Sequence, residues 1–134
     1  MNYAGVHSIS QLDLMNTMPE ILIVALILII VRILYIATLF QKAGEKWWYS
    51  IIPIYNNWIM IKIGINKAHP LFLLLYLVPY VNVLYAMMIE FVFIKAYKVS
   101  TPMAILYLII PPIIGPIVAI TDKYQYSEEH KVNL

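Results

Sequence analysis

The stretch QKAGEKWWYSIIPIYNN, residues 41–57, decides how the rest of the chain is interpreted. Charges, a glycine, a tryptophan pair, a proline and an asparagine pair stand close together in it. On both sides of it the sequence consists almost entirely of hydrocarbon side chains. The stretch therefore separates the apolar segments of the chain.

The composition indicates that lipid surrounds most of the chain. Of the 134 residues, 63% are hydrophobic and 12% charged, against about half and about a quarter in soluble domains. A soluble globule of this size could not bury so much apolar surface. The net charge of +2 comes from singly scattered basic residues, which argues against nucleic acid as a partner. The absence of cysteine excludes disulfides and thiolate chemistry.

Residues 21–40 form the first predicted membrane span. They carry one charge, Arg32. At ~1.5 Å per residue, a helix of this length reaches ~30 Å, which is one hydrocarbon thickness. Pro19 and Glu20 suit the start of this helix, where a missing N–H and a negative charge are both favourable.

The basic residues around this span predict its orientation. No Lys or Arg precedes the span, whereas Lys42 and Lys46 follow it directly. The positive-inside rule therefore places residues 1–19 outside the cell as an N-terminal tail, with the 41–46 turn in the cytoplasm. A secretory signal would begin with a positively charged region, so we expect the span to be retained as an anchor.

Residues 47–65 are predicted to form a helix that does not cross the membrane. Pro53 suits the first turn of a helix, and a helix from 53 to 65 is only ~20 Å long. Such a segment lies in the interface or dips into the bilayer as a re-entrant half-helix. Aromatic residues typical of interfacial anchors support this position: Trp47, Trp48, Tyr49 and Trp58.

Two further apolar stretches complete a predicted membrane domain over residues 20–124, before a polar C-terminal tail at 125–134. Residues 70–94 form a second span, which Pro79 and Asn82 interrupt. Residues 102–121 form a third span, whose proline-rich second half should not be an ordinary helix throughout. We interpret four prolines as helix breaks: Pro53, Pro79, Pro111 and Pro112.

The lysine distribution favours three crossings over four. If residues 47–65 do not cross, six lysines lie inside, and only Lys95 and Lys98 lie outside. If they cross, the split is four and four. The positive-inside rule prefers the first arrangement. The predicted fold class is therefore an all-α integral membrane protein with three transmembrane helices plus one re-entrant or interfacial helix, and four transmembrane helices are the alternative.

Arg32 and Glu90 are the candidate intramembrane charges. A charge midway along a span costs ~2.5 kcal/mol or more, which marks Arg32 as either paired or snorkelling to the headgroups. Glu90 is its best partner. The three-span arrangement places Glu90 near the outer face, away from Arg32, whereas the four-span arrangement lets the two meet. A test of this pair therefore also reports on topology.

Three asparagines form the second candidate set: Asn56, Asn57 and Asn82. They could line a small polar cavity with Tyr55, Tyr80 and Tyr85. The alternative, which we favour, is hydrogen bonding between helices and capping beside Pro53 and Pro79.

The sequence shows no sign of an enzyme. It has no spaced carboxylate pair, no Gly-rich phosphate loop and no His cluster with the spacing of metal ligands. Lys46 and Ser50 stand four residues apart, but nothing marks an oxyanion hole beside them. We expect no catalytic residue, cofactor or metal.

A series of short motifs resembles a known family: Lys42-Ala43-Gly44, Trp47 or Trp48, Ile52-Pro53-Ile54-Tyr55-Asn56, Val78-Pro79 with Asn82, Lys95-Ala96 and Asp122-Lys123-Tyr124. The pattern, over residues 40–124, is similar to small bacterial multi-pass membrane proteins of unknown function. Their domain also occurs fused to some signal peptidase I enzymes. Tyr97-Lys98 stand where the family usually has Phe-Gly. The resemblance implies a fold and a membrane, but no reaction.

These observations predict a non-enzymatic protein of the bacterial cell membrane that passes the bilayer several times. The expected role is a scaffold or accessory subunit of a membrane complex, in secretion or the envelope. The alternative is a small oligomeric channel or transporter, since broken helices form ion and solute sites in transporters. The expected partners are the lipid bilayer and either further copies of the chain or another membrane protein.

Overall fold

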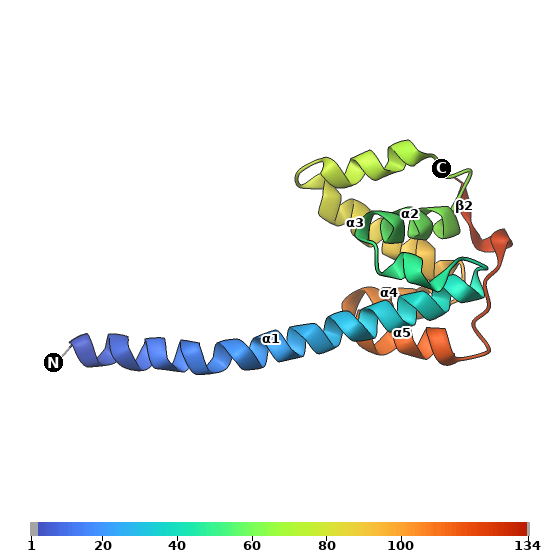
Figure 1. Cartoon of the computed structure of the whole chain (residues 1–134). Helices are drawn as coiled ribbons and strands as arrows, with labels where there is room; N and C mark the ends of the chain where they lie inside the picture. The colour runs from blue at the N-terminus through green and yellow to red at the C-terminus, as the bar shows by residue number, and fades with distance from the viewer. Residues whose placement is uncertain (1–2, 134) are drawn as a thin grey trace. The chain divides into compact units, whose positions relative to one another are not determined.

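The computed structural model of the chain describes residues 3–133, with side chains from residue 11 onward (Figure 1). The described residues form five α-helices: α1 Tyr3–Lys42, α2 Pro53–Gly64, α3 Val81–Lys95, α4 Thr101–Ile109 and α5 Pro111–Ile120. Short elements lie between and after them: η1 Trp47–Ser50, β1 Ile65–Asn66, η2 Pro70–Leu77, η3 Glu128–His130 and β2 Val132–Asn133. The chain is thus mostly helical, and it divides into two compact units, Met1–Val31 and Arg32–Leu134.

The first unit is helical throughout its described part. The helix begins at Tyr3, so the prediction that it starts at Pro19 is wrong, and Pro19 lies inside it. A proline removes one backbone hydrogen bond, and the helix continues through it here. The Thr17 hydroxyl donates to the carbonyls of Asp13 and Leu14 at 2.9 and 3.2 Å, so it adds side-chain hydrogen bonds beside the proline.

One helix in the described residues, Gln11–Lys42, is long and apolar enough to cross a membrane by its length and composition. A signal sequence near the N-terminus satisfies the same criteria. The three crossing helices favoured by the sequence are not seen, because the other apolar stretches are divided into shorter helices. At ~1.5 Å per residue, α3 reaches about 22 Å, which is less than the ~30 Å of a hydrocarbon core.

Residues 70–94, predicted as one interrupted span, form a hairpin instead. The 3₁₀ helix η2 packs against α3, and the chain turns between them at residues 78–80 (Figure 1). Tyr80 has a φ of 65° and is 93% exposed at this turn. Pro79 cannot donate a backbone hydrogen bond and disfavours helix in the preceding residue, so α3 has to start anew after the turn.

Residues 102–121 form a second hairpin. The chain breaks at Ile110, where φ is −132° and ψ is 65°, and α4 and α5 pack against each other. Pro111 and Pro112 occupy the first turn of α5, where the missing N–H groups have no intrahelical partner. The prediction that this half could not be a regular helix is therefore wrong, and α5 accommodates Pro116 as well.

The core of the second unit lies where α1, α2 and α3 meet. Phe40 and Phe93 pack edge to face with ring centroids 6.0 Å apart, and both are fully buried. α2 begins at Pro53, as the sequence predicts, and ends at Gly64. A Cβ atom at Gly64 would lie 2.9 Å from the backbone nitrogen of Phe93, so only glycine allows this approach of α2 to α3.

The C-terminal segment, residues 121–133, packs across the ends of the helices. The Ser127 N–H donates to the carbonyl of Ala96 at 2.9 Å, just after α3. Strand β2 pairs in parallel with β1, with Val132 opposite Ile65. The Tyr126 ring lies 6.0 Å from that of Tyr97. The polar residues predicted as a tail thus form part of the second unit.

Candidate functional site

Four side chains of the second unit meet in a closed hydrogen-bonded ring, the Arg32–Glu90 cluster: Arg32, Tyr35, Glu90 and Tyr107. Arg32 and Tyr35 stand three residues apart on α1, so they share one face of the helix. Glu90 comes from α3 and Tyr107 from α4. Three helices, distant in sequence, therefore supply the cluster.

The carboxylate of Glu90 is bonded through both of its oxygens. Oε1 forms an ion pair with the Arg32 guanidinium, and Oε2 accepts the hydroxyl hydrogen of Tyr107 at 2.6 Å. Arg32 also donates to the hydroxyl of Tyr35 at 3.3 Å, and the two tyrosine oxygens lie 3.4 Å apart. Charge-assisted bonds of this kind offset the cost of removing the ion pair from water.

The rings of the cluster are fixed by close packing. Tyr35 and Tyr107 are nearly fully buried, and their rings meet edge to face at 6.3 Å. Gly115 of α5 lies directly against Tyr35, since a Cβ atom there would come within 2.6 Å of the ring. Glycine at this position therefore brings α5 close enough to close the cluster on one side.

A pocket of about 290 Å³ opens beside the ion pair. Arg32, Glu90 and Tyr107 supply its polar wall, and apolar residues from both hairpins supply the rest: Val83, Ala86, Met87, Leu108 and Pro111. The side chain of Arg32 is 42% exposed and that of Glu90 is 19% exposed. A charge pair in the wall of a mostly apolar pocket can hold a small ion or polar group by exchange with one of its own partners.

The comparisons with known proteins point to one family. The family of unknown function DUF5684 matches residues 48–129 of the chain. The chain belongs to this family. Curated proteins and solved structures offer no match to it.

The DUF5684 match covers the greater part of the second unit but not α1. Glu90 and Tyr107 lie inside the matched range, whereas Arg32 and Tyr35 precede it. The resemblance drawn from the sequence began at Phe40, so its Lys-Ala-Gly motif also lies before the match. A link to signal peptidase I stays a prediction.

The asparagines do not join the Arg32–Glu90 cluster. Asn56 lies in the first turn of α2, and its side-chain oxygen is buried without a partner among the described residues. The hydroxyl of Tyr85, on α3, is also buried without a hydrogen-bond partner among the described residues. Asn57 and Asn82 are half-buried, while Tyr80 is exposed at its turn. The structure therefore does not gather these residues into one polar cavity.

The predicted interface anchors lie on η1 and α2. Trp47 and Trp48 are 52% and 38% exposed. The Ser50 hydroxyl donates to the carbonyl of Trp47 at 2.8 Å, so it serves the local turn. Tyr49 stacks on Tyr55 with ring centroids 5.4 Å apart. Trp58 lines a second, apolar pocket of about 280 Å³ with four neighbours: Ile54, Tyr55, Pro70 and Leu73.

Sequence reasoning missed the two tyrosines of the cluster and the role of Lys42. The spacing of Arg32 and Tyr35 was the available signal, since side chains three apart on a helix are neighbours. Lys42 donates to three backbone carbonyls, those of Val118, Thr121 and Tyr124, at 2.9–3.1 Å. These carbonyls belong to the end of α5 and the segment after it. No local sequence pattern predicts that Lys42 binds them.

Tyr97 forms a second contact between distant segments that the sequence does not predict. Its hydroxyl donates to the carbonyl of Leu39 at 2.6 Å and joins the turn after α3 to α1. Burial raises the pKa of Tyr97 well above its ordinary value, so the hydroxyl keeps its proton and stays a donor.

Proposed function

We propose that this DUF5684 protein is a non-enzymatic integral protein of a bacterial cell membrane, acting as a scaffold or accessory subunit of a membrane complex in secretion or the envelope. The apolar outer surface of the second unit carries this proposal. Large hydrophobic residues of both hairpins and α2 are at least 70% exposed: Ile54, Leu77, Leu84, Ile109 and Ile120. Apolar surface of this extent indicates contact with lipid or with another protein.

The state of the Arg32–Glu90 cluster supports a structural role over a catalytic one. Both oxygens of Glu90 are already bonded, and the tyrosine hydroxyls are bonded to each other or to the ion pair. A general base or nucleophile needs a free partner site within reach of a substrate. The cluster therefore serves best to lock α1, α3 and α4 together.

Purification through a tag on this chain tests the accessory role. The mass of the complex in mild detergent is measured, and every co-purifying protein is identified. A defined stoichiometry with one unrelated membrane protein supports the proposal. An unrelated tagged membrane protein of similar size, purified in the same way, is the control. A pure homo-oligomer of defined size would overturn the accessory role.

The second candidate function is a small oligomeric channel or transporter. The pocket of about 290 Å³ beside the ion pair favours it, since charged residues inside membranes mark ion and solute pathways. Flux through liposomes containing the purified protein tests it, with Arg32→Gln and Glu90→Gln as the variants expected to change flux. Lys62→Gln, which removes a charge away from the pocket, is the matched control.

A further inference from the structure

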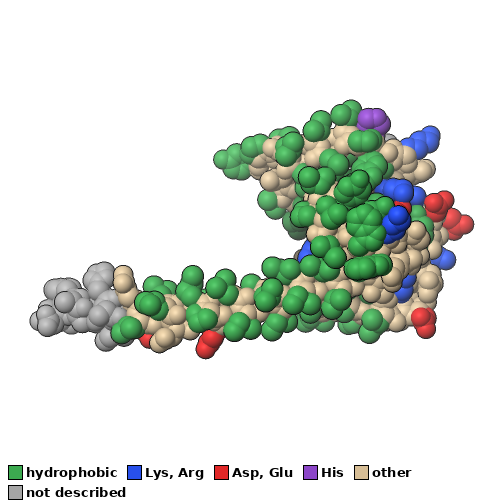
Figure 2. Space-filling view, viewed as in Figure 1, with side chains coloured by type: hydrophobic (Ala, Val, Ile, Leu, Met, Phe, Trp, Pro, Cys, Tyr) green, Lys and Arg blue, Asp and Glu red, His purple; other side chains and the backbone are tan. Residues whose placement is uncertain are grey.

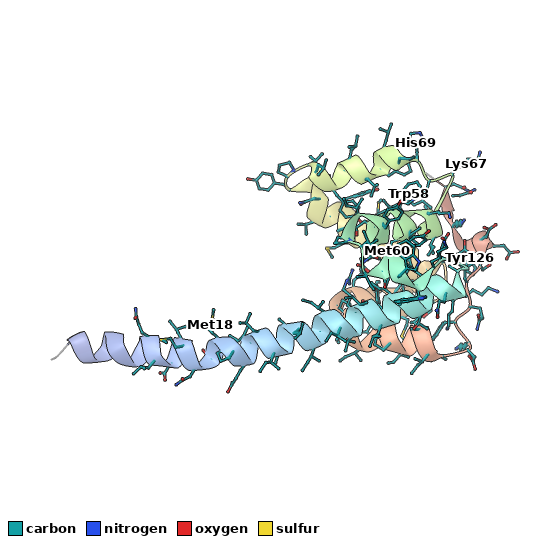
Figure 3. The ribbon with its side chains drawn as sticks, in the orientation of Figure 1. Met18, Trp58, Met60, Lys67, His69 and Tyr126 are labelled. Carbon is teal, nitrogen blue, oxygen red and sulfur yellow. The ribbon has the colours of Figure 1, made fainter. Side chains whose placement is uncertain are left out.

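The two ends of the second unit differ in chemistry. Contacts bring the C-terminal segment to the ends of four helices: Lys42 of α1, Ile65 after α2, Ala96 after α3 and Thr121 after α5. We call this end of the unit the polar end. Lys67 and Tyr126 both lie there (Figure 3). Figure 2 shows most of the unit's charged side chains gathered at this end.

The hairpin turns lie at the other end, which we call the apolar end. The turn at residues 78–80 precedes α3, and the break at Ile110 precedes α5, so both turns are a helix length away from the polar end. The pocket beside the ion pair contains Val83, from the start of α3, together with Pro111, from the second turn. The start of α3 and the start of α5 therefore line one pocket. The residues at these turns are apolar or aromatic: Val78, Pro79, Tyr80, Ile109 and Ile110.

All eight lysines of the chain lie at the polar end. Lys95 and Lys98, which a three-span arrangement places outside, flank Ala96, whose carbonyl accepts from Ser127 of the C-terminal segment. Lys62 pairs there with Glu45 at 2.5 Å. Four acidic residues share this end with the eight lysines: Glu45, Asp122, Glu128 and Glu129. The polar end is therefore net positive, and the lysines divide eight to none between the two ends.

The helix lengths fit entry into the bilayer from one face. At ~1.5 Å per residue, α4 and α5 reach about 14 and 15 Å, and α3 about 22 Å. Half of a ~30 Å hydrocarbon core is ~15 Å, so each hairpin reaches the middle of the bilayer or somewhat beyond and returns.

We infer that the second unit enters the bilayer from a single face, with both hairpins re-entrant, and that the lysines of the polar end bind the anionic lipid headgroups of the cytoplasmic leaflet. This inference rests on the membrane location in the proposed function. The three-span and four-span arrangements divide the eight lysines six to two and four to four between the two faces of the membrane. Entry from one face instead places all eight on the cytoplasmic face, which is the largest excess that the positive-inside rule could favour. Each lysine near an anionic surface adds to the attraction.

Single cysteines test the topology, since the natural chain has none. Cysteine is placed at Lys46, Ser100 and Lys123, three exposed positions of the polar end, and at Leu77 and Ile109 beside the turns. A membrane-impermeant maleimide is added to intact spheroplasts and to inverted membrane vesicles. We expect all three polar-end positions to react in inverted vesicles only, and the two turn positions to react in neither.

Reaction of Ser100→Cys from the face opposite to Lys46→Cys would overturn the inference and restore the three-span arrangement. Reaction of Leu77→Cys or Ile109→Cys from that opposite face would do the same, since a hairpin would then cross. Lys98→Cys repeats the measurement on the same loop if Ser100→Cys fails to accumulate. Extraction of the protein from membranes by alkaline carbonate would instead show that it is not an integral membrane protein, and the proposed function would then be wrong as well.

The headgroup contact is tested with the purified full-length protein and vesicles of equal phosphatidylglycerol and phosphatidylcholine. Native mass spectrometry counts the lipids retained. We expect the anionic lipid to be retained at least threefold over the neutral one. The triple variant of Lys46, Lys67 and Lys123 to Gln should lose this preference, whereas Glu128→Gln with Glu129→Gln should keep it. Equal retention of the two lipids by the natural chain would overturn the headgroup assignment.

Discussion

Arg32 and Lys42 lie ten residues apart on α1, and the second unit satisfies them in different ways. Arg32 is held by side chains, the carboxylate of Glu90 and the hydroxyl of Tyr35. Lys42 is held by three backbone carbonyls at the end of α5 and after it. Arg32 lies beside the apolar pocket, whereas Lys42 lies at the polar end.

The difference shows how the surroundings of a charge decide what can satisfy it. An apolar region offers no water, so the charge of Arg32 needs an opposite charge, and that partner needs further hydrogen bonds. The last carbonyls of a helix carry a partial negative charge, which suits a cation such as Lys42. Loss of one partner should therefore cost more at Arg32 than at Lys42.

Glu90→Gln is expected to have the largest effect. It leaves the Arg32 guanidinium without an opposite charge in an apolar region, and the cost of such a break is about 3 kcal/mol. Unfolding by dodecyl sulfate, followed by tryptophan fluorescence, measures the loss. The double variant Arg32→Gln with Glu90→Gln should recover most of it. A double variant as unstable as Glu90→Gln alone would show that the pairing is not the cause.

Gly64→Ala should have the next largest effect, and it tests the packing of α2 against α3. The new methyl group would meet the backbone of Phe93, which cannot move aside as a side chain can. Overpacking of this kind costs about 2 kcal/mol, measured as a lower melting temperature in detergent. Gly44→Ala, where nothing lies within 4 Å, adds only the strain of its positive φ and serves as the comparison.

Lys42→Met should cost less than Glu90→Gln, because Lys42 is hydrogen-bonded to neutral carbonyls and no hydrogen-bonded charge is left behind. The three carbonyls lose a charged donor, for which about 1.5 kcal/mol is expected, and water at the polar end takes over part of the role. The same unfolding measurement applies. Lys46→Met removes an exposed charge nearby and should change stability little. A loss at Lys42 equal to that at Glu90 would remove the contrast between the two sites.

Glu45→Gln should have the smallest effect. It breaks the ion pair with Lys62 at the polar end, where the Lys62 side chain is 52% and the Glu45 side chain 18% exposed, and pairs in contact with water contribute about 0.5 kcal/mol. Unfolding at low and high salt checks this, since the contribution should vanish when salt screens the charges. A salt-independent loss above that of Lys42→Met would contradict the assignment of this pair to a solvated surface.

The helix starts after proline could be predicted from sequence because their cause is local. Pro53 begins α2, as predicted, since a proline lacks the N–H that a first helical turn leaves unused. Pro111 begins α5 for the same reason, although it was interpreted from the sequence only as a helix break. The direction of the chain after each break could not be predicted in this way. A break permits either a kinked span or a hairpin, and contacts such as Gly115 against Tyr35 decide between them.

The pairing of Arg32 with Glu90 likewise has one part that the sequence predicts and one part that only the structure decides. The sequence marks both residues as costly charges, because a charged residue type within an apolar stretch can be recognised without knowing the fold. It could not decide whether they meet, since that depended on an assumed topology. The third and fourth members, Tyr35 and Tyr107, are ordinary aromatic residues in sequence, and only the assembly of three helices gives them partners.

The sequence by itself determined that this protein is helical, rich in exposed hydrocarbon and punctuated by prolines, because those properties follow from composition and local backbone chemistry. Only the tertiary structure decided that the apolar stretches return as hairpins and that the lysines gather at one end. Those features depend on contacts between residues far apart in the chain, such as Ser127 with Ala96, and no local pattern encodes such contacts.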